Sequence, residues 1–120
     1  MTAYLRRSSE FQTVYRNGRR YEGSLITAFV LPNNLPYNRF GITASRKAIG
    51  NAVQRNRARR LLREAFRLKE SVLGGLHENY DWVFNAKRKL PSLKASAAFE
   101  EFEKVVSKVA REESKTHTFG

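Results

Sequence analysis

The chemistry of this chain is concentrated in one segment where arginine recurs every few residues. Between residues 46 and 70 stand nine lysines and arginines against two glutamates, a net charge of +7 out of +12 for all 120 residues. A guanidinium group is planar, so it can bind two phosphate oxygens at once or stack on a base. This charge indicates a polyanionic partner, and nucleic acid is the first candidate.

A helix from about Asn51 to Glu70 would position these arginines. Advancing about 100° per residue from Val53, the apolar side chains gather on one face between about 60° and 180°: Ala58, Leu61, Leu62, Ala65 and Leu68. The other face carries Asn56, Arg59, Arg60, Arg63 and Arg67, while Arg55 and Arg57 flank the apolar stripe. We therefore predict a helix that covers a sheet with one face and presents arginines with the other.

A solvated surface helix and a membrane-surface helix both fit this pattern less well. A merely solvated face normally mixes charges at i,i+4 spacing, whereas Arg55, Arg59 and Arg63 place like charges at that spacing. A membrane-surface helix would expose Trp, Phe and Leu on its apolar face. Here the apolar stripe is expected to cover strands instead. Nucleic acid remains the favoured partner.

The remaining pattern predicts an α+β fold. The other predicted elements are a helix from Ser8 to Asn17, strands at 25–31, 39–45 and 81–86, and a last helix after Pro91. This order is typical of an α+β or split α/β sandwich. A helix joining parallel neighbouring strands normally makes a right-handed crossover. We expect one domain over residues 1–112 and a flexible tail over 113–120.

Composition excludes several classes of protein. There is no cysteine, which removes disulfides, thiolate metal sites and cysteine nucleophiles. No stretch approaches the roughly 20 apolar residues of a membrane span, and the N-terminus lacks a signal core, so we expect a soluble, cytoplasmic protein. His77, His117, Glu64 and Asp81 form no catalytic pattern in the sequence. We predict no catalytic site and no metal site.

Ordered motifs surround the arginines. They are Ser45-Arg46-Lys47, Gly50-Asn51-Ala52-Val53, Arg55-Asn56-Arg57, Arg60-Leu61 and Arg63-Glu64-Ala65-Phe66, flanked by Phe11-x-x-x-Tyr15, Phe40-Gly41-Ile42, Asp81-Trp82-Val83 and Ala86-Lys87-Arg88. Together they resemble the signature of the bacterial ribonuclease P protein family, whose arginine-rich motif centres on Arg-Asn-Arg. The resemblance covers about residues 5–110.

The resemblance implies both a fold and a function. The fold would be an α/β sandwich with a mostly antiparallel sheet of about four strands and three helices, shared with a ribosomal protein domain, and with a left-handed crossover. The function would be that of the protein subunit of ribonuclease P, which helps a catalytic RNA subunit remove the 5′ leader of precursor tRNA. Mg²⁺ would act through the RNA, and no cofactor, membrane or obligate protein partner is expected.

The resemblance also implies two binding surfaces. The expected contacts to the RNA subunit are Arg55, Asn56, Arg57, Arg59, Arg60, Arg63 and Arg67. The expected contacts to the leader are Phe11, Tyr15, Phe29, Thr43, Arg46, Lys47 and Ala86, with the choice between Arg46 and Lys47 open.

Residue reasoning supports the second surface, because Phe29, Thr43 and Ala86 are expected on strand faces that the long helix does not need. Aromatic platforms with basic rims hold single strands. The alternative for Phe11, Tyr15 and Phe29 is simple core packing. Two alternative functions are a structural RNA-binding protein, such as a ribosomal or RNA-chaperone subunit, and a protein-only nuclease. A precursor-tRNA cleavage assay separates the first of these from a ribonuclease P subunit.

Overall fold

A five-stranded mixed sheet forms the middle of the described chain. The structure, a computed structural model, describes the backbone of residues 3–117 and the side chains of residues 3–115. The strands are β1 (Ala3–Tyr4), β2 (Arg19–Glu22), β3 (Ile26–Pro32), β4 (Arg39–Thr43) and β5 (Tyr80–Ala86), in the order β1-β4-β5-β3-β2. The helices are α1 (Ser8–Asn17), α2 (Arg46–Ile49), α3 (Ala52–Leu68), α4 (Glu70–Leu73) and α5 (Ala95–His117), with a 3-10 turn η1 (Leu90–Ser92).

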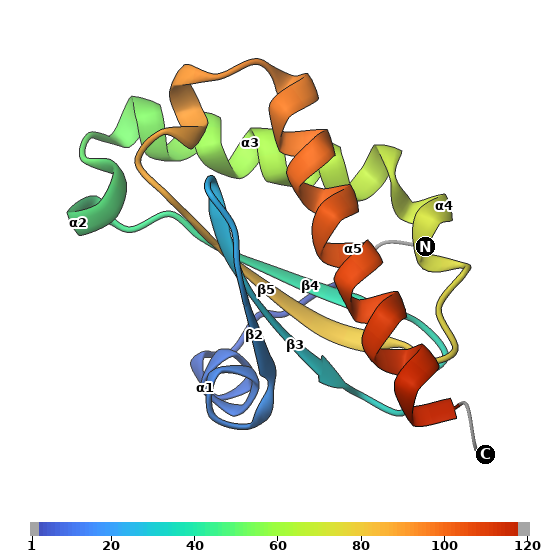
Figure 1. Cartoon of the computed structure of the whole chain (residues 1–120). Coiled ribbons are helices and arrows are strands. Elements are labelled where there is room, and N and C mark those ends of the chain that lie inside the picture. The colour runs from blue at the N-terminus through green and yellow to red at the C-terminus, as the bar shows by residue number, and fades with distance from the viewer. Residues whose placement is uncertain (1–2, 118–120) are drawn as a thin grey trace.

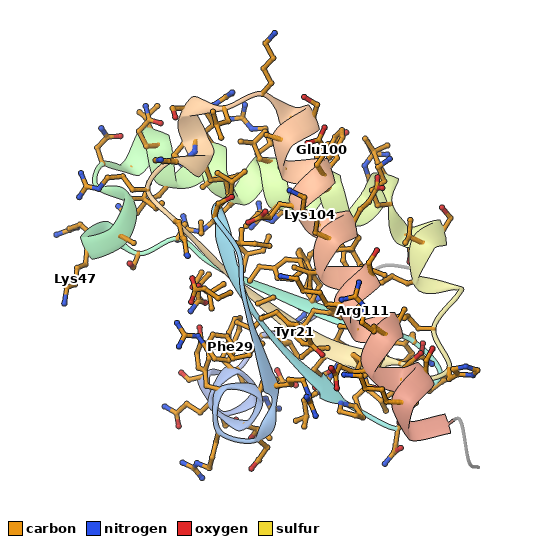
Figure 2. The ribbon with its side chains drawn as sticks, viewed as in Figure 1. Tyr21, Phe29, Lys47, Glu100, Lys104 and Arg111 are labelled. Atoms are coloured by element: carbon orange, nitrogen blue, oxygen red, sulfur yellow. The ribbon has the colours of Figure 1, made fainter. Side chains whose placement is uncertain are left out.

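The sheet is covered on both faces. Helices α3 and α5 lie over one face, and α1 lies against the other (Figure 1). Alternation along β3 sends Ile26, Ala28 and Val30 into the larger core under α3 and α5. Phe29 points to the opposite side and lies beside α1 (Figure 2), where it packs on the smaller cluster of Leu5, Val14 and Val83.

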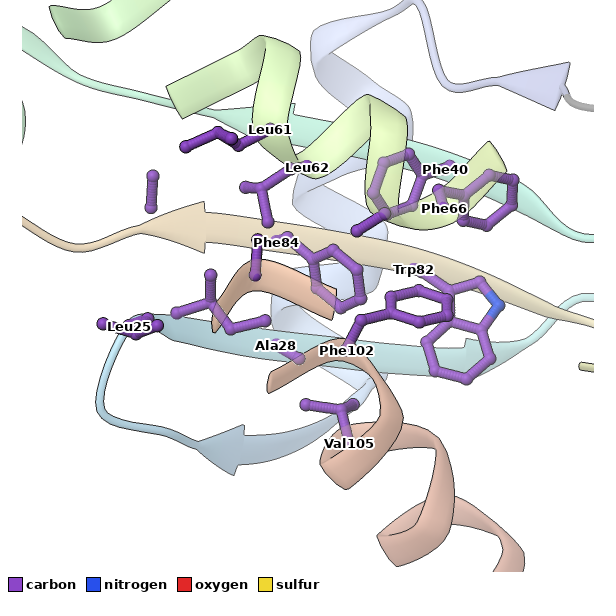
Figure 3. Packing of buried hydrophobic residues seen from close by; sticks show 14 of the residues in the cluster. Leu25, Ala28, Phe40, Leu61, Leu62, Phe66, Trp82, Phe84, Phe102 and Val105 are labelled. Atoms are coloured by element: carbon purple, nitrogen blue, oxygen red, sulfur yellow. The ribbon is translucent and has the colours of Figure 1, made fainter. Parts of the chain in front are cut away.

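Phe66 is the residue that fixes α3 on the sheet. Its ring stacks on Phe40 of β4 at 4.2 Å and 20°, and it meets Phe102 of α5 edge-on at 6.1 Å (Figure 3). The predicted apolar stripe is wrong at one margin, because Leu68 is 49% exposed; Val53, outside the predicted stripe, is 74% exposed. The buried side of α3 instead consists of Ala58, Leu61, Leu62, Ala65 and Phe66.

The connection from β4 to β5 is left-handed, as the family resemblance implied and contrary to the general rule. These strands pair in parallel and are neighbours in the sheet. In Figure 3, β4 lies above β5, both strands run to the left, and α3 runs back in front of them. The chain therefore leaves β4, crosses the face toward the viewer and descends to β5 in the left-handed sense.

The predicted α+β class is confirmed, although details differ. The described sheet has five strands, and β1·β4 and β4·β5 are parallel while β2·β3 and β3·β5 are antiparallel. Strands β1 and β2 and helix α2 were not predicted. The reason is physical: β1 has two residues, α2 has four, and β2 is a charged edge strand without apolar alternation.

The predicted flexible tail from residue 113 is wrong as far as His117, because α5 continues to that residue. Glu113 is 5% exposed and accepts hydrogen bonds from the backbone N–H of His77 at 2.8 Å and of Glu78 at 3.1 Å, and from the Tyr80 hydroxyl. Burial and this hydroxyl contact raise the pKa of Tyr80 above its usual range. Glu113 lies at the helical spacing of the buried apolar residues of α5. Because its side chain is charged, the sequence suggested that this part of the chain would be exposed to solvent. Residues 118–120 lie outside the described residues.

Candidate nucleic-acid interface

The start of the arginine helix is fixed by capping. Asn51 accepts a hydrogen bond from the backbone N–H of Gln54 at 2.9 Å, which satisfies one of the free donors at the N-terminus of α3. Ser45 caps α2 in the same way through the N–H of Ala48 at 3.1 Å. Between them Gly50 has φ of 102°, a left-handed conformation that favours glycine. These local signals set the orientation of every arginine that follows.

The outer side of α3 is a face of exposed cations. Arg60 and Arg63 are exposed, and no hydrogen bond or ion pair joins them to another described residue. Arg59 is half-buried and donates to the Asn56 side chain at 3.4 Å. Arg67 pairs with Glu64 at 2.6 Å, in an exposed contact of small energetic value. Glu64 is the only acid in α3, so the face keeps a positive charge.

Arg57 points to the protein rather than to this outer face. Its guanidinium donates from Nε to the carbonyl of Pro91 at 2.5 Å and from Nη2 to the carbonyl of Leu93 at 3.1 Å. It thereby ties α3 to the η1 turn that precedes α5. Arg55 is half-buried, and its Nε has no hydrogen-bond partner among the described residues. Arg55 and Arg57, which were predicted to flank the apolar stripe, therefore have different surroundings from Arg60 and Arg63, which bond to no other described residue.

On the other side of the sheet, α1 and β4 enclose a shallow hollow of about 380 Å³. Its lining consists of Arg6, Ser8, Phe11, Gln12, Tyr15 and Thr43. Phe11 can lie against β4 because position 41 is glycine, where a Cβ atom would come within 2.6 Å of the Phe11 ring. Tyr15 is 36% exposed and meets Phe29 edge-on at 4.9 Å. We call this hollow, with Phe29 behind it, the α1 groove.

Asn85 of β5 links the two walls of the α1 groove and was not predicted. Its Oδ1 accepts from the Tyr15 hydroxyl at 2.8 Å and from the Thr43 hydroxyl at 2.5 Å. Strand alternation could have found it, since it places Asn85 on the face opposite Trp82 and Phe84. The sequence signal was a polar residue, Asn85, on the strand face opposite Trp82 and Phe84, where the polar residues Tyr15 and Thr43 could bond to it.

Ala86 does not line the α1 groove, and the prediction that it lies on the strand face free of the long helix is wrong. It is 5% exposed and lies in the larger core with Trp82 and Phe84, on the face covered by α3 and α5. The period of two along β5 puts residues 82, 84 and 86 on one side. Arg46 and Lys47 are both exposed on α2, and Figure 2 shows Lys47 projecting outward from the end of the molecule.

A second hollow of about 350 Å³ joins the arginine face to the edge of the sheet. Its lining consists of Tyr4, Leu5, Phe11, Phe40, Gly41, Ile42, Arg59 and Arg63. Phe11 lines both hollows, so the two candidate surfaces meet at that ring. Tyr4 is 41% exposed and was not predicted, because the strand that carries it is too short to show alternation.

A cluster of ion pairs holds α1 on the sheet. Arg39 of β4 binds Asp81 through two donors at 2.8 and 2.6 Å, and Glu10 of α1 through a third at 2.8 Å. Glu10 also accepts from the backbone N–H groups of Arg7 and Arg6. These N–H groups, and then the charge of Arg39, hold the pKa of Glu10 below its usual range. The carboxylate therefore stays ionised and anchors the start of α1.

The described residues contain no group of three or more His, Asp or Glu that could hold a metal ion. Glu64 of α3 pairs with Arg67, and Glu10 of α1 and Asp81 of β5 both pair with Arg39. No described helix is long and apolar enough to cross a membrane.

A mixed sheet with an arginine-faced helix on one side and an aromatic groove on the other defines a basic α+β protein with the surface features typical of nucleic-acid-binding proteins. The family model named Ribonuclease P matches residues 1–110, and the chain belongs to the ribonuclease P protein family.

Relatives agree with this assignment. The chain is 39% identical over 111 residues, 92% of each chain, to the ribonuclease P protein component of Caldanaerobacter subterraneus subsp. tengcongensis. It is 36% identical over 105 residues to that of Fusobacterium nucleatum, covering 88% of this chain and 91% of the relative.

Solved structures show the same fold. The RNase P protein of Thermotoga maritima matches with a TM-score of 0.76 at 24% identity, covering 88% of this chain and 96% of that one. The Staphylococcus aureus RNase P protein matches with a TM-score of 0.75 at 24% identity, covering 89% and 96%.

Proposed function

We propose that this chain is the protein subunit of a ribonuclease P ribonucleoprotein that promotes 5′-end maturation of tRNA. It binds the catalytic RNA subunit through the arginine face of α3, and the single-stranded 5′ leader of precursor tRNA through the α1 groove. The observation that carries the proposal is the pair of exposed cations Arg60 and Arg63, which have no partner among the described residues.

The arginine face suits a folded RNA. Unpaired guanidinium groups with neighbours of the same sign repel one another at i,i+3 and i,i+4 spacing. A phosphate backbone removes that repulsion and releases its own counterions on binding. Arg59 and Arg63 also border the hollow with Tyr4, so an aromatic ring is available beside the phosphate-binding groups.

The α1 groove suits a single strand. Duplex RNA keeps its bases stacked, whereas a single strand can lay them on aromatic rings along a basic rim. Phe11 and Tyr15 provide the rings and Arg6 provides a cation at the lining. Arg46 and Lys47 stand exposed just beyond Thr43 and extend the basic rim.

The reaction itself is assigned to the RNA. Mg²⁺ prefers oxygen ligands and near-octahedral geometry, and the carboxylates Glu64 and Asp81 are engaged with arginines. These engaged carboxylates, and the absence of a cluster of three or more His, Asp or Glu among the described residues, favour a metal that is not held by the protein. We propose that the metal enters with the RNA and that the protein contributes binding and orientation.

A cleavage assay tests this function. The chain alone is expected to leave precursor tRNA intact, and to raise cleavage by the cognate RNA subunit when magnesium is low. The gain should shrink when the leader is shortened to one nucleotide, because the α1 groove is then empty. Stimulation that does not depend on the leader would contradict the groove assignment. An absence of any stimulation would favour a purely structural RNA-binding role.

A further inference from the structure

Asn85 lies on β5 next to the α1 groove and is hydrogen-bonded to two residues of its lining, Tyr15 and Thr43. In the register of the sheet it lies between Thr43 on β4 and Thr27 on β3. It is half-buried, and its side chain reaches Tyr15 of α1 as well as Thr43. A single side chain thus connects the central strand to both walls of the groove.

The carbonyl end of this amide is saturated. Oδ1 has two lone pairs, and it receives the Tyr15 hydroxyl at 2.8 Å and the Thr43 hydroxyl at 2.5 Å. The amide nitrogen carries two N–H donors, for which the described residues offer no partner. Because the two hydroxyls come from opposite walls, they fix the plane of the amide and leave its donors in a set direction.

We propose that Asn85 is a specificity-determining residue whose amide nitrogen donates a hydrogen bond to an acceptor atom on the base of one nucleotide in a single-stranded RNA. The base lies against the rings of Phe11 and Tyr15. Tyr15 and Thr43 act in addition as positioning residues, since their hydroxyls orient the amide. The inference rests on the proposed function of the α1 groove as the leader site.

The chemistry favours a base over a phosphate. A neutral amide among aromatic side chains is a poor match for a charged phosphate, which binds more strongly to guanidinium groups. Arg6 lines the groove, and Arg7 is exposed next to it, so phosphates have better partners at the rim. Base rings stack on aromatic side chains, and a base stacked on Tyr15 would bring its edge toward Asn85, which is hydrogen-bonded to the Tyr15 hydroxyl.

Two substitutions separate this role from a structural one. Asn85→Asp keeps an oxygen acceptor for both hydroxyls and removes the N–H donors. Asn85→Ala removes both. Thr43→Val deletes one orienting hydroxyl at nearly constant shape, and Thr13→Val is its matched control, because Thr13 lies exposed on α1 and its hydroxyl donates only to the Ser9 carbonyl.

The experiment measures binding of precursor tRNA by the holoenzyme reconstituted with its cognate RNA subunit. The leader is made in a series with one abasic nucleotide at each position in turn. A lost neutral hydrogen bond predicts a roughly three- to tenfold weaker affinity for Asn85→Ala. Asn85→Asp should weaken binding at least as much while the melting temperature of the protein stays unchanged. The Asn85→Ala penalty should vanish for the leader that lacks the one base in contact, whereas Asn85→Asp, which also adds a negative charge, should lose only the base-dependent part of its penalty.

Thr43→Val should reduce the same base dependence, and Thr13→Val should leave it intact. A penalty of equal size at every abasic position, or no penalty with Asn85→Asp, would overturn the role of Asn85 while leaving the leader groove in place. If the wild-type holoenzyme bound leaderless and leader-bearing substrates equally well, the proposed function of the groove would fail first, and the inference with it.

Discussion

Replacing Arg60 and Arg63 together by alanine is expected to weaken binding of the protein to its RNA subunit by about two to four orders of magnitude. Each exposed guanidinium can make a charge-assisted contact to phosphate, and hydrogen bonds to charged groups contribute about 1.5–3 kcal/mol each. Neither side chain is bonded to another described residue, so little folding stability should be lost. The measurement is a filter-binding or fluorescence titration at several salt concentrations.

The salt dependence makes this prediction specific. The slope of log affinity against log salt should become shallower by about 0.7–0.9 for each phosphate contact removed. Lys104→Ala with Arg111→Ala is the matched control, since it removes two exposed cations from the outer side of α5 (Figure 2). Equal losses in the two double variants would mean that only net charge matters. Arg57 is unsuitable for this test because it bonds the Pro91 and Leu93 carbonyls.

Replacing Phe66 by alanine is expected to lower the free energy of unfolding by about 3–5 kcal/mol, the usual cost of deleting a buried phenyl ring. Phe66 is 1% exposed and its ring stacks on Phe40 at 4.2 Å, so the cavity would open between α3 and the sheet. Urea unfolding followed by circular dichroism measures the change.

The matched controls are Val53→Ala and Leu68→Ala on the same helix. Both side chains are substantially exposed, so each substitution should change stability by less than about 0.5 kcal/mol. If either of them cost as much as Phe66→Ala, the orientation of α3 on the sheet would be wrong, and with it the outward direction of its arginines.

Helix α3 shows how much of the structure hydrophobic periodicity can predict. The sequence pattern predicted a helix with one apolar and one basic face, and both faces exist. The pattern placed the apolar face too close to Leu68 and left out Phe66, because a helical wheel carries no information on where the sheet lies. The buried side is centred between Ala58 and Leu62, which includes Phe66 and leaves Val53 and Leu68 at the rim.

The α1 groove shows a different limit. Phe11, Tyr15 and Thr43 were predicted, and the structure brings them together. Asn85 was missed, and Ala86 was placed on the wrong face, although the two are adjacent in the chain. Which face of β5 meets α1 depends on strand register, and a shift by one residue exchanges the faces. Alternation along β5 separates Asn85 from Ala86, but which of the two faces meets α1 depends on contacts between distant segments, which local sequence does not supply.

Site-directed crosslinking tests most directly whether the protein binds two RNAs on two surfaces. The chain has no cysteine, so single-cysteine variants carry one photoactive label each. Labels at Gln12→Cys in the α1 groove, at Glu64→Cys beside the arginines and at Ser107→Cys on exposed α5 are compared in the holoenzyme bound to precursor tRNA. The label at 12 should react with the leader, the label at 64 with the RNA subunit, and the label at 107 with neither. Equal reaction of the labels at 64 and 107 with the RNA subunit would show that α3 does not face it.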